Sequence, residues 1–274
     1  MSQISHLKTI FSSMINLQLA VDFLKYRLKA KTRHGVHSPF AYRLVDQVIY
    51  DFQAKKIYAD IEKLRSELVR DMRSITITDH NDGSLLNKNK QKKVSALARN
   101  ILKPARVDQL IHRLVADLNP GNIIESGTCL GITTAYLAKA APNARVISIE
   151  GCPETAVIAL ENLEKLQIQN TEICVGDFKE HLPNIIEGIT ALDLILINGR
   201  HTKEAILNYF QCCLPKLSER SIMIFHHIHR SKEMNRAWEH IKEHPEVSVT
   251  IDLFQIGLVF VKKGQAKEDF AIRF

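Results

Sequence analysis

The chain has 274 residues, of which 45% are hydrophobic and 24% charged, so it can bury a sizeable core as one large or two modest domains and is not a mostly disordered chain. The five cysteines are odd in number and form no C-x-x-C pair, which disfavours a disulfide scaffold or a cysteine zinc module and predicts a reducing, cytoplasmic setting. No apolar run approaches the roughly 18 residues that span a bilayer, and the amino terminus has no signal-peptide pattern.

The positive charge is unevenly distributed along the chain. Residues 1–113 hold 21 Lys plus Arg and 10 Asp plus Glu, whereas residues 114–274 hold 16 and 20. The formal net charge of +7 therefore belongs to the first region, and the two regions differ in character.

The first region shows helical periodicity. From Ile4 to about Lys29, apolar residues recur at three- and four-residue steps, which predicts one amphipathic helix. Gly35 and Pro39 break it, and Ser38 is expected to cap a second helix over residues 39–50. A third helix is predicted over residues 54–71.

A polar segment follows these helices. Residues 79–84 carry a turn signal, and residues 87–93 form a run with four lysines. We predict a helical amino-terminal domain over residues 1–100 that ends in a mobile basic loop, and a second domain over residues 101–274.

The second region alternates short apolar runs with amphipathic segments from Asn119 onward. The runs predict buried strands at 122–125, 145–150, 171–175, 192–197 and 221–225, with helices at about 131–140, 153–167, 179–187 and 202–217. This alternation predicts a parallel sheet covered by helices on both faces. Residues 247–254 and 256–262 are two adjacent strand-like runs, for which we expect an antiparallel hairpin at the sheet edge.

The first strand of this region ends in a two-glycine loop. Gly127 and Gly131 let the backbone approach a ligand closely, and the helix that begins here offers free N–H groups. Glu150 ends the second strand, 23 residues after Gly127, where a carboxylate can accept both hydroxyls of a ribose. After the third strand, Asp177 can meet an adenine amino group and Phe178 can stack on the base.

These motifs and the closing hairpin resemble class I S-adenosylmethionine-dependent methyltransferases, and the loop resembles the catechol and caffeoyl-CoA type of O-methyltransferase. The chain also resembles a group of bacterial class I methyltransferases, including over His34–Phe40. The resemblance implies an α/β fold with a mostly parallel, seven-stranded Rossmann-like sheet and an antiparallel last strand. It implies S-adenosylmethionine as cofactor, S-adenosylhomocysteine as product, and a cofactor site at Glu125, Gly127, Thr128, Gly131, Ile132, Thr133, Glu150, Gly151, Cys152, Gly176, Asp177, Phe178 and Asn198.

Two other interpretations of the loop stay open. A nicotinamide-dependent dehydrogenase also uses glycine turns and an acidic group on the ribose, but Glu125 before the first glycine and the closing hairpin favour the methyl donor. In the second interpretation, the glycines only permit tight packing and Glu150 only caps the helix near Pro153.

The predicted catalytic end of the sheet departs from the metal-dependent relatives. In those enzymes, two aspartates and an asparagine at the ends of the fourth and fifth strands hold Mg²⁺. This chain has Asn198-Gly199-Arg200-His201 and His226-His227-Ile228-His229 at these places, with no carboxylate. Because Mg²⁺ prefers oxygen ligands and binds poorly to imidazole, we do not expect the usual Mg²⁺ site.

Three hypotheses for these candidate catalytic residues stay open. In the first, His226, His227 or His229 acts as a general base, since neutral imidazole has a suitable pKa. In the second, two or three of His201, His226, His227 and His229 bind a softer ion such as zinc, iron or nickel, although His226 and His227 would point to opposite faces if both lie on a strand. In the third, catalysis has been lost and the fold binds a ligand or a partner.

The sequence thus predicts an S-adenosylmethionine-dependent methyltransferase that acts on an oxygen of a small molecule. The alternatives are a catalytically impaired protein that binds the donor or S-adenosylhomocysteine, and an RNA-directed methyltransferase. Clustered positive charge attracts phosphate, but nucleic acid is disfavoured because no RNA-binding module and no Asn-Pro-Pro-Tyr-like segment is present.

The basic first region has other interpretations. Basic residues near Arg33 fit an anionic acceptor, and residues 88–93 fit part of a lid. The first helix could form a homodimer interface, lie on an anionic membrane surface, or pack on its own domain.

Overall fold

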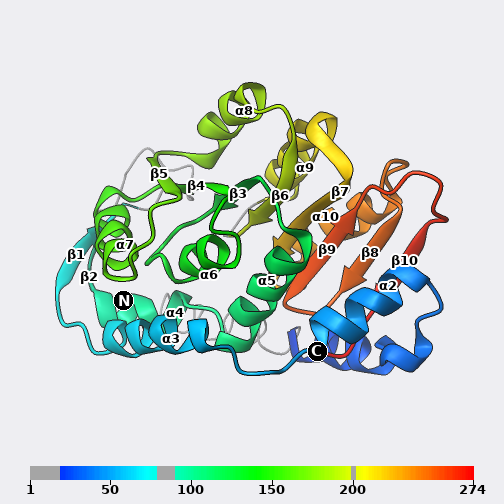
Figure 1. Cartoon of the computed structure of the whole chain (residues 1–274), viewed down its shortest axis with the longest axis horizontal. Helices are drawn as coiled ribbons and strands as arrows, with labels where there is room; N and C mark the ends of the chain where they lie inside the picture. Colours follow the sequence, from blue (N-terminus) through cyan, green and yellow to red (C-terminus); the bar gives the residue numbers. More distant parts are fainter. Residues whose placement is uncertain (1–18, 79–89, 199–201) are drawn as a thin grey trace, which may run out of the picture.

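The computed structural model describes residues 19–78, 90–198 and 202–274, and its centre is a twisted sheet with helices on both faces (Figure 1). In the described residues this sheet has eight strands in the order β10-β8-β9-β7-β6-β3-β4-β5. The strands are β3 (Asn122–Ser126), β4 (Arg145–Glu150), β5 (Thr171–Val175), β6 (Leu192–Ile197), β7 (Leu217–His226), β8 (Val249–Asp252), β9 (Ile256–Phe260) and β10 (Glu268–Ala271).

The first five strands of the sheet are parallel, as predicted. β3 pairs with β4 and β6, β4 with β5, and β6 with β7, all in parallel register, while β9 is antiparallel to both β7 and β8. The predicted hairpin is therefore confirmed. The predicted number of seven strands and the edge position of the hairpin are wrong, because β10 pairs in parallel with β8 and covers that edge.

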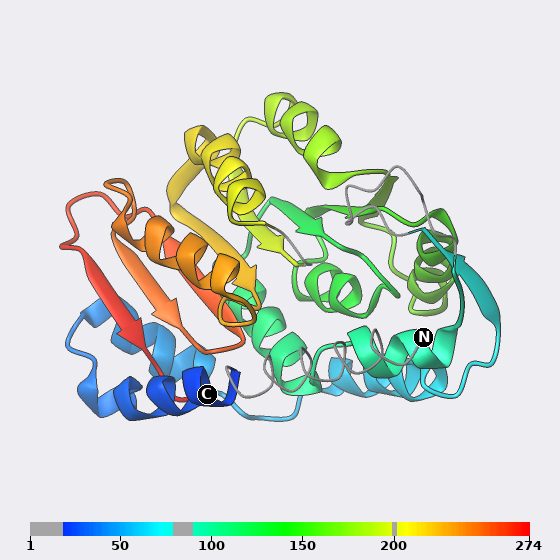
Figure 2. The same cartoon turned by 180° about the vertical axis from the view of Figure 1, so that it is seen from behind.

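Alternate residues of the central strands bury two hydrophobic faces. Ile123 and Leu194 belong to one core cluster, while their neighbours Ile124 and Ile195 belong to the other. Helices α5, α6 and α7 lie on the first face, and α8, α9 and α10 on the second; α9 and α10 are in front in Figure 2. The helices are α5 (Ala105–Leu118), α6 (Ile132–Ala140), α7 (Pro153–Lys165), α8 (Phe178–Gly188), α9 (Lys203–Cys213) and α10 (Lys232–Glu243).

The amino-terminal region is helical, as predicted, but its helices differ in detail. Residues 19–29 are helical, and the rest of the predicted first helix lies outside the described residues. The predicted second helix is divided into α2 and a π-helical turn, and Ser38 does not cap it by its side chain; the Ser38 hydroxyl instead accepts a hydrogen bond from Gln265. The elements are η1 (Arg33–Gly35), α2 (Pro39–Leu44), η2 (Val45–Ile49), α3 (Lys56–Leu68) and α4 (Val94–Ile101).

This region packs directly on the sheet and its helices. Val45 and Ile49 share a core cluster with Ile111 of α5 and Ile224 of β7, and α3 and α4 share another with α6 and α7. This region also contacts the carboxyl-terminal segment, since the N–H of Lys31 donates to the carbonyl of Ala271 at 2.8 Å. The division into two domains near residue 100 stays a prediction, and residues from both predicted domains share the same hydrophobic cores.

A two-stranded ribbon lies beside α7, at the β5 end of the sheet (Figures 1 and 2). It pairs β1 (Ser74–Ile77) with β2 (Lys90–Lys93) in antiparallel register, so part of the predicted basic loop is strand. Residues 79–89 lie outside the described residues. None of the helices in the described ranges is long and apolar enough to cross a membrane.

Candidate functional site

The predicted site residues gather at the carboxyl ends of four neighbouring strands. The order β7-β6-β3-β4 places the ends of these strands along one edge. The loop after β3 is central, Glu150 ends β4, Asn198 follows β6, and His226 ends β7. A ligand across this edge can contact all four positions, as is typical of open parallel sheets.

The two glycines of the loop meet different neighbours. Gly127 has φ +83°, and a Cβ there would lie 3.0 Å from the carbonyl oxygen of Asn198. Gly131 has φ +77°, and its Cβ would lie 3.3 Å from Ala159 of α7. Both positions thus need glycine for their backbone conformation and for close packing, and Gly127 in addition keeps the loop against the end of β6.

Glu125 is a fully buried carboxylate beneath this loop. Its Oε2 accepts hydrogen bonds from Thr134 Oγ1 at 2.5 Å and from Ser148 Oγ at 2.7 Å, while its Oε1 has no hydrogen-bond partner among the described residues. Burial raises the pKa of Glu125 to about 7, and the nearby positive charge of Lys103 opposes this shift. The Glu125 carboxylate therefore supports the loop from below.

Glu150 connects the loop to the start of α7. Its Oε2 accepts the N–H of Cys129 at 2.7 Å, and its Oε1 accepts the N–H of Cys152 at 2.9 Å. The Glu150 side chain is partly exposed. The bond to Cys152 reaches the residue that precedes α7 and not an N–H inside the helix. A carboxylate oxygen has two lone pairs and can accept more than one hydrogen bond, and the binding of ribose hydroxyls stays a prediction.

The segment after β5 is built mainly by local structure. Gly176 has φ +148° and donates its N–H to the carbonyl of Glu150 at 2.9 Å. Asp177 caps α8, since its Oδ1 accepts the N–H of Lys179 at 2.9 Å. Phe178 is buried and packs edge-to-face on Tyr209, with 4.7 Å between ring centroids. Contacts of Asp177 and Phe178 with adenine stay predictions.

The remaining predicted cofactor residues line the loop and the two helix starts. Thr128 is buried and shares a 2.6 Å hydrogen bond with Ser148. Thr133, in the first turn of α6, donates to Asp108 Oδ1 at 2.8 Å. Ile132 and Cys152 are buried, and Gly151 lies between Glu150 and Cys152 at the start of α7.

His226 and Asn198 form a hydrogen-bonded pair on the β6–β7 side. His226 Nδ1 lies 2.8 Å from Asn198 Oδ1, and because the amide oxygen accepts, Nδ1 carries the proton. Burial lowers the pKa of His226 well below its usual value, and the charges of Lys103, His227 and Arg230 add to this. His226 is therefore neutral near pH 7, with the lone pair on Nε2, which no hydrogen bond of the described residues uses.

His227 lies against His226 and does not point to the opposite face. The ring centroids of the two histidines are 3.6 Å apart. The strand ends at His226, and His227 has φ 63°, so the alternation expected for strand neighbours no longer applies. His227 Nε2 lies 3.3 Å from the guanidinium of Arg230, from which it accepts, so this nitrogen is engaged.

His229 has both ring nitrogens bound to side-chain oxygens. Nδ1 lies 2.8 Å from Asn235 Oδ1, and Nε2 lies 2.7 Å from Asp252 Oδ2. Burial alone would lower the pKa of His229, but the hydrogen bond and charge of Asp252, with Asn235, raise it above its usual value. This geometry does not favour His229 as a general base, because no lone pair remains for an acceptor proton.

The described residues form no group of three or more His, Cys, Asp or Glu side chains that could hold a metal ion. Where the metal-dependent relatives have carboxylates, the amide oxygen of Asn198 already accepts from His226. These donors do not fit Mg²⁺, which requires oxygen ligands, and no step below depends on a metal. His201 lies outside the described residues, and a softer metal at the histidines stays a prediction.

The sequence interpretation missed a buried lysine at this site. Lys103, in the connection between α4 and α5, is 6% exposed, and its Nζ donates to Thr133 Oγ1 at 2.9 Å. Its charge affects the pKa values of Glu125, Cys129 and His226. The sequence shows only a lysine between apolar Leu102 and Pro104, and this pattern is too weak to predict that the lysine is buried.

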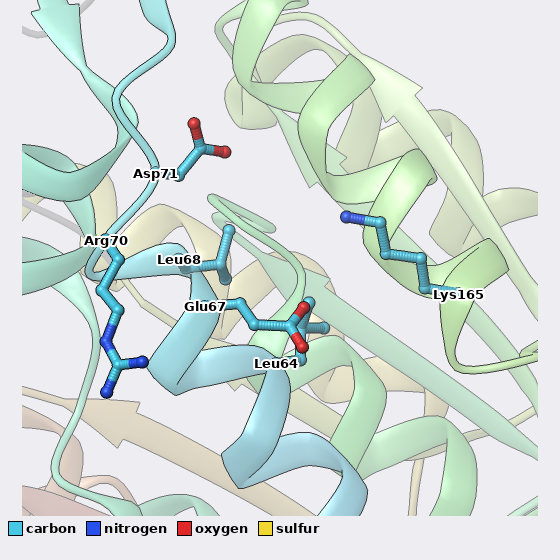
Figure 3. Close-up of a pocket in the computed structure, with 6 residues that line it drawn as sticks. All are labelled: Leu64, Glu67, Leu68, Arg70, Asp71 and Lys165. Carbon is cyan, nitrogen blue, oxygen red and sulfur yellow. The ribbon is translucent and has the colours of Figure 1, made fainter.

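Two hollows in the described surface lie outside the strand ends. One, of ≈ 350 Å³, lies between α3 and the end of α7 and contains no predicted site residue (Figure 3). The other, of ≈ 420 Å³, is lined by Leu19, Ala20, Phe23, Arg106, Leu253, Phe254, Gln255 and Phe274. It adjoins the histidine pair, because the carbonyl of Gln255 accepts the N–H of His227 at 2.7 Å.

The donor set fits the amphipathic structure of S-adenosylmethionine. Glu150 offers carboxylate lone pairs for a ribose, and Gly127 has no Cβ at the point where the loop approaches Asn198. The buried ammonium of Lys103 and the first turn of α6 provide positive potential beside the loop. These features fit a ligand that carries a ribose and, beyond it, an amino-acid group.

Known proteins show the same fold and related sequences. Residues 124–228 match a family described as "Methyltransferase domain". The catechol O-methyltransferase of Niastella koreensis is 33% identical over 106 residues, which are 38% of this chain and 47% of that protein. The catechol O-methyltransferase of Mycobacterium tuberculosis is 30% identical over 113 residues, which are 40% of this chain and 49% of that protein. The chain thus spans about half the length of these curated relatives.

A solved structure covers more of the chain. The O-methyltransferase TomG from Streptomyces achromogenes, in complex with SAM, superposes with a TM-score of 0.55 at 16% identity, covering 78% of this chain and 92% of that one. At this identity the likeness concerns the fold. Together with the family match over residues 124–228, it confirms the resemblance to methyltransferases that the sequence motifs indicated, and in sequence the chain is similar to catechol O-methyltransferases over about 40% of its length.

Proposed function

We propose that this protein is an S-adenosylmethionine-dependent methyltransferase that transfers a methyl group to an oxygen of a small molecule without a Mg²⁺ site. The observation that carries the proposal is one edge of the sheet, where Glu150 and the glycine loop lie beside a neutral His226 whose Nε2 lone pair is available. When bound, S-adenosylmethionine supplies an electrophilic methyl group on a sulfonium.

The residues of β3 and β4 bind and orient the donor. Glu150 accepts the ribose hydroxyls while it keeps its hydrogen bonds to the N–H groups of Cys129 and Cys152. Gly127 keeps the loop close to Asn198, at the end of β6 beside β7. A donor held by this loop would present its methyl group toward the side where His226 lies.

The residues of β6 and β7 act on the acceptor. Asn198 fixes the His226 tautomer with the proton on Nδ1, so Nε2 would take the hydroxyl proton of the acceptor. The acceptor oxygen would receive the methyl group of the bound sulfonium, whose carbon–sulfur bond would break, and S-adenosylhomocysteine would be the leaving group. Its lowered pKa keeps His226 unprotonated near pH 7, but also makes it a weak base. We therefore expect an acceptor with an acidic hydroxyl, such as an electron-poor phenol or a hydroxamate.

The hollow beside His227 is the proposed acceptor site. Phe23, Phe254 and Phe274 supply aromatic surface, and the guanidinium of Arg106 lies 5.4 Å from the Phe274 ring centroid. An aromatic ring with an anionic substituent suits this mixture of apolar wall and positive charge. Recognition of the anion near Arg33 is a less favoured arrangement, since Arg33 already pairs with Asp46 at 2.6 Å.

Calorimetry with S-adenosylhomocysteine, followed by an acceptor screen with S-[methyl-³H]adenosylmethionine, tests the proposal. The screen compares phenols, catechols and hydroxamates with and without a carboxylate, in EDTA. We expect binding, and EDTA-resistant transfer to an acidic hydroxyl. Absence of binding at 1 mM would exclude the function altogether.

A second candidate function is binding of the donor or product without catalysis. The low pKa of His226 favours it, because a weak base removes a proton slowly. Binding without transfer to any acidic hydroxyl would support this candidate. A homodimer and an RNA acceptor stay predictions, and a salt-dependent shift of tRNA at low ionic strength would be required for the latter.

A further inference from the structure

Lys103 is a buried cation with few partners. Its side chain is 6% exposed, and in the described part of the chain its Nζ has a single hydrogen bond, to Thr133 Oγ1 at 2.9 Å. An ammonium group has three donors, and a buried charge is stable only when it is paired and hydrogen-bonded. Two donors of Lys103 are therefore available to a ligand.

A hydrogen-bond network fixes the position of this ammonium. Thr133 donates its proton to Asp108 Oδ1 at 2.8 Å, so its oxygen must accept from Lys103. Asp108 is fully buried and is also bound by Arg65 at 2.6 Å. The network holds Lys103 in place and pairs Asp108 with Arg65. The Lys103 charge acts on the buried Glu125, but the described residues form no ion pair with Lys103 within 4.0 Å.

The charge of Lys103 acts on the centre of the site. It lowers the pKa values of three surrounding groups: Glu125 below the loop, Cys129 in the loop, and His226 at the end of β7. Lys103 thus lies beside the loop, on the side of Thr133 in the first turn of α6.

The strand order bears on which part of the donor reaches this place. If Glu150 on β4 accepts the ribose, as proposed, the two ends of the donor would lie on either side of β4; the strand order puts β3, α6 and Lys103 on one of these sides, to which we assign the amino-acid end. That end carries the only carboxylate of S-adenosylmethionine. The first turn of α6 also directs free N–H groups at an anion there.

The geometry points to Lys103 and Thr133 as a clamp for the methionine carboxylate of the donor, which makes the protein selective for donors that carry this carboxylate. The inference depends on the proposed function, because it assigns a part of the same cofactor. The Lys103 ammonium donates to one carboxylate oxygen, and Thr133 orients the ammonium.

Calorimetry with S-adenosylmethionine and its decarboxylated analogue tests this assignment. The analogue keeps the adenosine, sulfonium and amino groups. We expect the wild-type protein to prefer S-adenosylmethionine by about 30-fold, and Lys103→Met to reduce the preference to about 3-fold or less. Lys139→Met, a change on a partly exposed lysine of α6, is the matched control and should keep the full preference.

Methylthioadenosine, which lacks the amino-acid end, reports whether the rest of the site is intact. Its affinity should be equal in the wild type and in Lys103→Met. If Lys103→Met does not fold, the affinities of the wild-type protein for the two donors still test the clamp, because equal affinities would overturn it.

Other outcomes separate this inference from the proposed function. A wild-type protein that binds no donor excludes both. A preference that persists in Lys103→Met shows that another group binds the carboxylate. An unchanged preference with a raised acceptor KM places Lys103 at the acceptor, and overturns the clamp while the proposed function stands.

Discussion

The two halves of the site satisfy their polar groups in opposite ways. In the donor half, formed by the loop after β3 and the end of β4, Glu150 is a carboxylate bound by two backbone N–H groups. In the acceptor half, formed by the ends of β6 and β7, Asn198 and His226 are a neutral pair with one mutual hydrogen bond. The Glu150 side of the site thus presents a carboxylate, whereas the Asn198–His226 pair presents neutral groups.

This difference determines what the acceptor half can do. A divalent cation stabilises an ionised acceptor oxygen by its charge. A neutral imidazole can only remove the proton, and it does so best from an acidic hydroxyl. In the proposed function, chemistry in the acceptor half would therefore depend on one nitrogen, His226 Nε2, whereas binding in the donor half would be distributed over several groups.

The largest expected effect is in the acceptor half. His226→Gln removes the proton acceptor while glutamine can still hydrogen-bond to Asn198. Loss of a general base lowers kcat by about 10²- to 10⁴-fold. Single-turnover transfer with the acceptor from the screen measures this, and the Kd of S-adenosylhomocysteine should change by less than about 3-fold.

The control for this change is His240→Gln, which removes an exposed histidine of α10. It should leave both kcat and Kd unchanged. A His226→Gln protein with full activity would contradict the role of the imidazole as general base and would show that another group removes the proton.

The second effect is in the donor half. Glu150→Gln keeps the shape but replaces one carboxylate oxygen by an amide that cannot accept. We expect a loss of about 2 kcal/mol, or about 30-fold, in affinity for S-adenosylhomocysteine. Methylthioadenosine should lose a similar factor, because it retains the ribose, and calorimetry measures both.

Glu154→Gln is the matched control for Glu150. Glu154 is also a carboxylate at the start of α7, and its Oε2 accepts the N–H of Thr76 in the ribbon at 2.6 Å. It should have little effect on affinity. Equal affinities for wild type and Glu150→Gln would reduce Glu150 to the capping interpretation that the sequence left open.

The donor half could be predicted from sequence because its function depends on local backbone patterns. A strand that ends in Glu125, two glycines at fixed spacing and a carboxylate that ends the next strand are each visible in the sequence. Strands β4, β5 and β6 have the predicted bounds. The register of parallel neighbours then brings the strand ends together without further information.

The acceptor half could not be predicted to the same depth because it depends on contacts distant in sequence. His227 turns beside His226 because its backbone adopts φ 63°, and His229 is engaged by Asp252, 23 residues later. Lys103, beside the loop of the donor half, escaped prediction for the same reason, since its hydrogen-bond partner Thr133 lies 30 residues away in sequence. The eighth strand, β10, also escaped prediction, since a four-residue edge strand gives no clear period.

The smallest expected effect is on stability and concerns His229, which we expect to take no part in the chemistry of His226. The folded-state pKa of His229 is raised by Asp252, so its ion pair stabilises the fold fully below the unfolded pKa of about 6.5 and loses this contribution as pH rises through the folded value. His229→Gln should therefore be less stable than wild type by about 1 kcal/mol at pH 6, and the difference should shrink toward pH 9. Urea unfolding at several pH values measures it.

The kcat of this variant should stay within about 3-fold of wild type, because both nitrogens of His229 are engaged outside the site. A stability difference that is constant with pH would show that His229 is neutral in the fold. A large loss of kcat would show that the acceptor half extends beyond Asn198 and His226, and that its chemistry does not depend on a single nitrogen.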